Sequence, residues 1–170
     1  MQVRSRHFLS SKDIRNLKQE ILKTYPQLNS VLDLKNSRIE VITLTCNVKL
    51  YVVNNRVELI TVDDKLIPSI SLLNRGLDIP SITVDMGAVP FIIKGADVML
   101  PGIVACSDRV SKGSIVKIID EKHGKAIAVG EALIPLEDFK TGGKGRAVRI
   151  LHYVGDKIWG LTLSLNLNNS

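Results

Sequence analysis

The apolar positions of the first 78 residues change from a helical to a strand-like period. Within residues 10–25 the apolar side chains share one helical face, namely Ile14, Leu17, Ile21 and Leu22. Ser10 followed by Asp13 resembles a capping box, and a proline ends the run, so an amphipathic helix is predicted here. Strands are predicted over residues 39–44, 48–53 and 56–61. Asn54-Asn55 suits a two-residue hairpin turn between the last two strands.

Beyond residue 78 the pattern is that of short strands separated by turns. A proline-led helix is predicted over residues 68–76, and the connection at 77–80 marks a domain boundary. After it, β-favouring runs predict strands over residues 88–94, 103–106, 114–119, 125–133, 146–153 and 158–163. A helical turn at 98–100 and a short helix at 135–139 interrupt these strands. The pattern predicts a mixed or barrel-like β fold, and domains at 1–78 and 79–163 with a tail at 164–170.

Composition indicates a folded protein of a reducing compartment. The chain has 170 residues, 45% of them apolar, and the apolar residues are mostly Ile, Val and Leu, which favour sheet. No apolar run approaches the ~20 residues needed to cross a bilayer, and no hydrophobic signal region is visible at the N-terminus. Two cysteines are too few for a disulfide framework. We therefore expect a cytoplasmic, β-rich protein that does not contact a membrane.

The net charge of +6 indicates a polyanionic partner, and basic residues concentrate in two places. One is the N-terminal stretch that carries Arg4, Arg6, Lys12, Arg15 and Lys18. The other is the acid-free segment 140–149, which contains Lys140, Lys144, Arg146 and Arg149. Glycines at 142, 143 and 145 would let this backbone approach a ligand while the cations pair with phosphates. A solvated face or loop with incidental charge is the alternative interpretation of both.

A second candidate segment is the bend Lys-Gly-Ala-Asp-Val-Met-Leu-Pro-Gly at residues 94–102. Gly95 can adopt a backbone conformation closed to other residues, and Pro101-Gly102 is a strong turn signal. We expect backbone amides near this glycine to be free to approach a phosphate or a ribose. An ordinary corner between two elements would explain the same residues.

The sequence contains no motif typical of a catalytic or metal-binding site. The histidines His7, His123 and His152 lie outside any nucleophile motif, and Cys46 and Cys106 lack the spacing of metal ligands. No phosphate-binding glycine motif is present. We therefore expect a protein that is not an enzyme, with no catalytic residue, no metal and no cofactor.

Aromatic residues make up only 4% of the chain. Phe91, Phe139, Tyr153 and Trp159 have apolar neighbours in the sequence, so we expect them in the core. Recognition of RNA by base stacking is therefore disfavoured. A chain with so few aromatic residues is better suited to recognising the shape, phosphates and 2′-hydroxyls of an RNA duplex.

The bend and the glycine-rich segment also carry a family resemblance. Gly-Ala-Asp-Val-Met at 95–99 with Pro101-Gly102, Ala-Val-Gly at 128–130 and Gly-Lys-Gly-Arg at 143–146 resemble a PUA domain, named for pseudouridine synthase and archaeosine transglycosylase, over residues 80–163. The resemblance implies a six-strand pseudo-barrel that binds RNA, often the acceptor end of tRNA. It implies RNA contacts at Lys94, Gly95, Ala96, Asp97, Pro101 and Gly102, with Gly143, Lys144, Gly145 and Arg146. Many tRNA-modifying PUA domains have Arg where this chain has Leu100, which leans away from a detached transglycosylase module.

The N-terminal part resembles the pre-PUA region of the malignant-T-cell-amplified-sequence translation factors and their archaeal relatives. The resemblance rests on the order of a basic helix, a small sheet and the segment Lys-Leu-Ile-Pro-Ser-Ile-Ser-Leu-Leu at 65–73. It implies an α+β protein in which an N-terminal α/β pre-PUA domain precedes the PUA β pseudo-barrel with short helices. No catalytic domain is attached in this arrangement.

These observations support a non-catalytic RNA-binding protein of the translation apparatus that recognises tRNA or ribosomal RNA. The charge of residues 140–149 adds Lys140 and Arg149 to the expected RNA contacts. A ribosomal subunit or a translation initiation factor is the expected further partner. The alternatives are a subunit that delivers tRNA to a separate RNA-modification enzyme, and a module whose N-terminal domain docks a protein.

Overall fold

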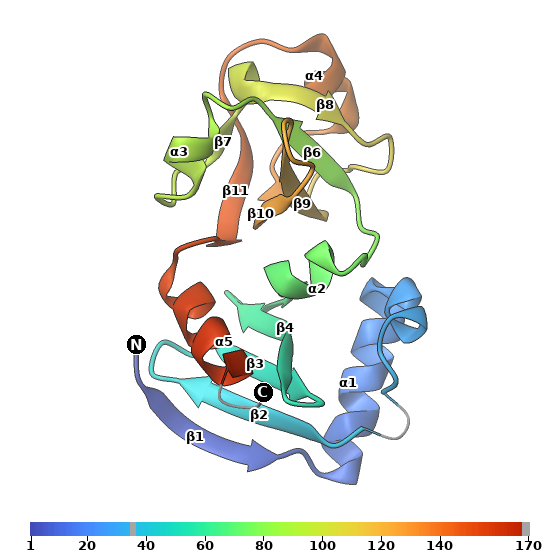
Figure 1. Cartoon of the computed structure of the whole chain (residues 1–170). Helices are drawn as coiled ribbons and strands as arrows, with labels where there is room; N and C mark the ends of the chain where they lie inside the picture. The colour runs from blue at the N-terminus through green and yellow to red at the C-terminus, as the bar shows by residue number, and fades with distance from the viewer. Residues whose placement is uncertain (35–36, 168–170) are drawn as a thin grey trace. The chain divides into compact units, whose positions relative to one another are not determined.

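A computed structural model describes residues 1–34 and 37–167, and the chain forms two compact units. The first contains residues 1–78 and the segment that begins at Leu161. The second contains Ile79–Gly160. Each unit has its own sheet, accompanied by short helices (Figure 1), so the expected α+β class is confirmed.

The sheet of the first unit is an antiparallel meander. Its strands, in spatial order, are β1 (Val3–Phe8), β2 (Ile39–Leu44), β3 (Lys49–Val53), β4 (Arg56–Val62) and β5 (Lys65–Pro68). Asn54 and Asn55 both have positive φ, the conformation that a two-residue hairpin turn needs and that Asn tolerates. The hairpin predicted at these asparagines is confirmed.

Three short helices accompany this sheet, namely α1 (Ser11–Thr24), the 3₁₀ turn η1 (Pro26–Ser30) and α2 (Ile70–Asn74). The Ser10 hydroxyl accepts the Asp13 N–H at 3.2 Å and caps α1 as predicted. Leu17 and Ile21 are the buried residues of its apolar face. The buried Tyr25 hydroxyl donates to the Leu66 carbonyl at 2.7 Å and attaches the end of α1 to β5.

The second unit is a six-stranded mixed sheet that curls into a nearly closed barrel (Figure 1). Its strands are β6 (Ser81–Val84), β7 (Val98–Met99), β8 (Ile103–Cys106), β9 (Ile115–Asp120), β10 (Ala126–Ala132) and β11 (Arg146–Tyr153), in the spatial order β7-β11-β10-β9-β6-β8. The β6–β9 pair is parallel and the other pairs are antiparallel. Fully buried aliphatic side chains from five strands, including Ile82, Ile118 and Val148, form its core.

The bend around residue 95 differs from its prediction in two elements. Residues 88–94, predicted as a strand, contain the helix α3 (Val89–Ile92). Pro90 lacks the N–H that a sheet requires but suits the first turn of a helix. Residues 98–100, predicted as a helical turn, instead form β7 and the start of the 3₁₀ turn η2 (Leu100–Gly102).

The C-terminal segment is a helix, not the strand predicted over residues 158–163. It forms α5 (Lys157–Leu167). One carboxylate oxygen of Asp156 accepts the Trp159 N–H at 2.6 Å, as an N-cap does, and so favours a helix here. The last three residues of the expected tail lie outside the described residues. None of the helices in the described part of the chain is long and apolar enough to cross a membrane.

Candidate nucleic-acid interface

The predicted bend and the predicted glycine-rich loop meet in the second unit. The Leu100 N–H donates to the Gly145 carbonyl at 2.9 Å, and Met99 pairs with Arg146 across β7 and β11. These contacts join segments more than forty residues apart in the sequence. We call the surface around them, formed by residues 85–102 and 143–146, the groove.

Asp85 fixes the outer wall of the groove. Its backbone N–H donates to the Gly102 carbonyl at 2.9 Å, and its carboxylate accepts the Ala88 N–H at 2.8 Å. A Cβ on Gly102 would lie 3.0 Å from the Ala88 Cβ. The start of α3 and the end of η2 are therefore held close together, and a larger residue at position 102 would push Ala88 outward.

Gly95 is required by its backbone conformation and by its neighbour. Its φ is +92°, and a Cβ there would lie 3.0 Å from the hydroxyl oxygen of Tyr153. The backbone amides beside it, however, are not free. The Gly95 N–H donates to the Ile92 carbonyl at 2.9 Å, and the Ala96 N–H donates to the Phe91 carbonyl at 3.1 Å. The expectation that these amides could approach a phosphate is wrong, because α3 has already engaged them.

Asp97 has both carboxylate oxygens occupied by the protein. One accepts the Ile150 N–H at 2.8 Å, and the other accepts from the Arg146 guanidinium at 3.0 Å. The side chain is 25% exposed. Asp97 therefore orients Arg146 beside the groove rather than offering a carboxylate to a ligand.

The cations of residues 140–149 are mostly paired with acids from other parts of the second unit. Lys140 of α4 (Leu136–Thr141) bonds Asp108 at 2.7 Å, and the guanidinium of Arg149 bonds Glu131 across β10 and β11 at 3.0 Å. The hydrogen bond and charge of Asp108 raise the pKa of Lys140 above its usual value. Residues 140–149 contain no acid, but acids from other segments lie beside them in the folded chain. Three of the four cations therefore form ion pairs.

Two lysines of the groove remain without a partner. The side chains of Lys94, shortly after α3, and of Lys144, before Gly145, form no hydrogen bond or ion pair with any residue that the structure describes. Gly143 and Gly145 both have positive φ, and a Cβ at either would meet no atom within 4 Å. Their backbone shape, rather than close packing, favours glycine on both sides of Lys144.

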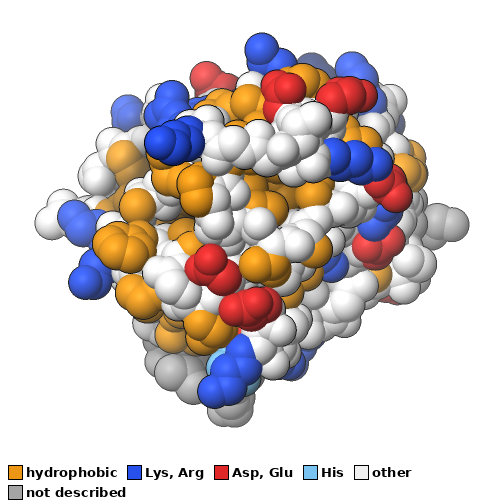
Figure 2. All heavy atoms as spheres, turned by 90° about the horizontal axis from the view of Figure 1, so that it is seen from above, with side chains coloured by type: hydrophobic (Ala, Val, Ile, Leu, Met, Phe, Trp, Pro, Cys, Tyr) orange, Lys and Arg blue, Asp and Glu red, His pale blue; other side chains and the backbone are white. Residues whose placement is uncertain are grey.

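An apolar cavity of about 430 Å³ lies in the groove. Residues of α3, β7 and η2 line it, among them Phe91, Met99 and Pro101. Phe91 is 66% exposed, so the prediction that it belongs to the core is wrong, whereas Phe139 is buried as predicted. Figure 2 shows hydrophobic, basic and acidic side chains exposed side by side on one face of the molecule. An aromatic ring is therefore available at the groove, which sequence reasoning missed because the neighbours of Phe91 in the chain are apolar.

The buried polar groups of the second unit serve structure. His152 is almost fully buried, and its Nδ1 lies 2.8 Å from a carboxylate oxygen of Asp156. Asp120 of β9 accepts the N–H groups of His123 and Lys125 and so closes the β9–β10 hairpin. Within the described residues, no group of three or more His, Cys, Asp or Glu side chains is placed to hold a metal ion.

Comparison with protein families divides the chain at the same place as its fold. The PUA domain matches residues 80–154, and a domain of unknown function, DUF1947, matches residues 5–76. A 30% identical hypothetical protein of Pyrococcus horikoshii superimposes with a TM-score of 0.81, over 93% of this chain and 99% of that one. A conserved PUA domain protein of Thermoplasma acidophilum, also 30% identical over the same shares, gives a TM-score of 0.73.

Proteins that are similar in sequence align with both units of the chain. An uncharacterized protein of Methanocaldococcus jannaschii is 39% identical, over 94% of this chain and 98% of its own. Translation machinery-associated protein 20 of Saccharomyces cerevisiae is 33% identical, over 95% and 94%. Malignant T-cell-amplified sequence 1 of Rattus norvegicus is 25% identical, over 89% and 87%. The chain therefore belongs to the family of PUA-domain proteins with a DUF1947 N-terminal region.

Proposed function

We propose that this protein acts without catalysis in the cytoplasm, by binding the acceptor end of tRNA or a similarly shaped part of ribosomal RNA in the groove. PUA domains bind RNA, and the Saccharomyces cerevisiae relative is a translation machinery-associated protein. A ribosomal subunit or an initiation factor is the further partner that this role implies.

The observation that carries the proposal is the position of the two unpartnered lysines. Lys94 and Lys144 belong to segments that β7 and β11 bring together, beside a cavity lined by Phe91. Phosphates can pair with the lysines, while the cavity and the ring accept an apolar base face or a ribose. The amides of Gly95 and Ala96 are engaged, so the contacts to phosphate come from side chains.

The test is the charge reversal of both lysines, Lys94→Glu with Lys144→Glu. Each phosphate contact contributes about one unit to the slope of log affinity against log salt. We expect affinity for tRNA or for ribosomal subunits to fall, and the salt slope to decrease by about two. Lys122→Glu is the matched control, because Lys122 is exposed in the β9–β10 turn and makes no ion pair with any described residue. An unchanged affinity and slope in the double variant would remove the groove from the RNA site.

Co-purification separates this role from its alternative. Recovery of ribosomal subunits with the intact chain is the expected result. Recovery of a transglycosylase or pseudouridine synthase in their place would favour a subunit that delivers tRNA to a modification enzyme.

A further inference from the structure

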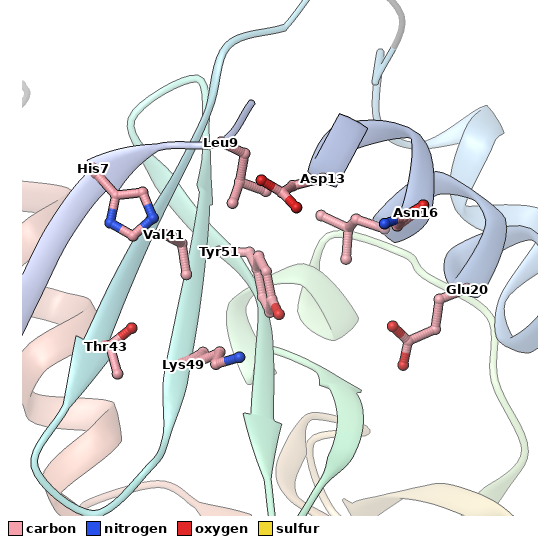
Figure 3. A pocket seen from close by; sticks show the side chains of 10 residues that line it. His7, Leu9, Asp13, Asn16, Glu20, Val41, Thr43, Lys49 and Tyr51 are labelled. Carbon is pink, nitrogen blue, oxygen red and sulfur yellow. The ribbon is translucent and has the colours of Figure 1, made fainter. Parts of the chain in front are cut away.

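A pocket in the first unit has walls of opposite charge (Figure 3). Its volume is about 380 Å³, and it is lined by α1 on one side and by β1, β2 and β3 on the other. Neither the RNA site nor the fold of the second unit uses these residues. Pockets of this volume can accommodate a small organic molecule.

The helical wall presents hydrogen-bond acceptors. Asp13, Asn16 and Glu20 recur at i, i+3 and i+7, so they share one face of α1. The Ser10 hydroxyl donates to Asp13 at 2.5 Å, which makes Asp13 part of the helix cap. The Glu20 side chain forms no hydrogen bond or ion pair with any described residue, and it is exposed to the pocket. Asp13 and Glu20 therefore both give this wall negative charge, and Glu20 is the acid whose carboxylate has no hydrogen-bond partner among the described residues.

The strand wall presents hydrogen-bond donors. Val41 of β2 lies opposite His7 on one side and Tyr51 on the other, and Thr43 lies opposite Lys49. Val41 and Thr43 are two residues apart, so these rows share the face of the sheet that lines the pocket. The Lys49 side chain has no hydrogen bond or ion pair within the described part of the chain.

Glu20 and Lys49, the two charged side chains without a partner, lie on opposite walls of the pocket and do not pair with each other. In Figure 3, Lys49 and Glu20 lie on opposite sides of Tyr51 and point toward it. Between them the pocket is apolar at its base, where Leu17 and Val41 are 5% and 4% exposed. The half-buried ring of Tyr51 adds an aromatic surface between the walls. A ligand that lies across this base can pair with both charges at once.

We propose that this pocket binds a small amino-acid-like zwitterion. Its ammonium group pairs with Glu20, its carboxylate pairs with Lys49, and its apolar part lies on Tyr51 and Val41. A polyanion such as RNA is disfavoured because Glu20 and Asp13 repel phosphates, and a simple cation is disfavoured because Lys49 repels it. A ligand with one charge of each sign at its two ends satisfies both walls.

The probe is 6-aminohexanoate, which carries an ammonium and a carboxylate at opposite ends of an apolar chain. Hexanoate and hexylamine have the same stem with one charge each. Binding to the full chain is measured by NMR titration, following the amides of β2, β3 and α1. An exposed ion pair contributes up to about a fivefold change in affinity. We expect 6-aminohexanoate to bind about fivefold more tightly than either analogue and to shift the amides of the pocket.

Charge exchange gives the sharper test. The single variants Glu20→Lys and Lys49→Glu should each lose the preference for the zwitterion. The double variant Glu20→Lys with Lys49→Glu should regain it, because the ligand can bind in the opposite direction. Lys23→Met, a change of an exposed lysine outside the pocket lining, is the control and should bind as the unmodified chain does. Equal affinity for all three probes, or a double variant that does not recover, would overturn the proposal.

Discussion

Replacing Gly130 by alanine is expected to destabilise the second unit by about 2–3 kcal/mol. Gly130 lies in β10, next to a shift in register against β11. A Cβ there would lie 2.5 Å from Cγ1 of Val148 and 2.6 Å from the Arg149 carbonyl oxygen. Val148 is fully buried and the carbonyl belongs to a paired strand, so neither can move without disturbing the barrel. Overpacking of a core costs ~1–3 kcal/mol, and two such contacts place this change at the upper end.

The same substitution at Gly160 is expected to raise the free energy of unfolding instead of lowering it. Gly160 lies within α5, does not have a positive φ, and a Cβ there would meet no atom within 4 Å. Alanine in a helix is more favourable than glycine by ~0.5–1 kcal/mol. Gly160→Ala is therefore a matched control for the loss of glycine as such.

Urea titration followed by far-UV circular dichroism measures both variants, and the fluorescence of Trp159, the single tryptophan, reports on the second unit. With slopes of ~1–3 kcal/mol per molar urea, the midpoint should fall by roughly 1 M for Gly130→Ala and rise slightly for Gly160→Ala. A Gly130→Ala midpoint equal to that of the unmodified chain would refute the close packing of β10 on β11.

Three further predictions concern single side chains. Burial acts to raise the pKa of Asp156, but the hydrogen bond and charge of His152 and the N–H groups of Trp159 and Tyr153 outweigh it, so this pKa lies below its ordinary value. Stability should therefore fall as the pH drops below ~4, and urea midpoints from pH 6 to pH 3 should show a shallower loss for Asp156→Asn. Phe91→Ala should weaken RNA binding by ~1–3 kcal/mol in a filter-binding assay, with stability unchanged within ~0.5 kcal/mol. Tyr25→Phe should lower the free energy of unfolding by ~1 kcal/mol in urea titrations, because the buried Leu66 carbonyl loses its donor.

Each of these has a result that would contradict it. Asp156→Asn with an unchanged acid dependence would assign the pH effect to other carboxylates. Unaltered binding by Phe91→Ala would favour recognition of RNA shape alone, as the low aromatic content first indicated. A Tyr25→Phe variant of full stability would mean that water replaces the lost donor.

Sequence patterns predicted the elements whose side chains alternate between core and solvent. The hairpin at Asn54-Asn55 and helix α1 follow local rules of turn chemistry and periodicity, and both are confirmed. The family resemblance was equally informative, because its motif residues include Gly95 and Gly102, whose neighbours leave little room for a larger residue. Strand β1 had no such signal, since all six of its side chains are exposed and none shows which face packs inward.

The ion pairs around the groove could not be predicted in the same way. Arg146 bonds Asp97, 49 residues away, and Arg149 bonds Glu131, 18 residues away. These partners meet only because β7, β10 and β11 are neighbours in one sheet. The mistaken strand at residues 88–94 has a local cause, because Pro90 stands alone in a run of apolar, β-favouring residues that is otherwise typical of a strand.

The pairing of three of the four cations in residues 140–149 has a consequence for competition among RNAs in a cell. Five phosphate contacts, from Lys94 and the four cations of residues 140–149, would weaken binding about 500-fold between 50 and 200 mM salt, whereas Lys94 and Lys144 alone give about 12-fold. When electrostatic contacts contribute little to the binding free energy, the protein is only weakly attracted to bulk nucleic acid of any sequence. If the groove binds RNA as proposed, the ion pairs of Asp97, Asp108 and Glu131 are expected to limit sequestration by abundant RNA and to leave discrimination to the shape of the groove.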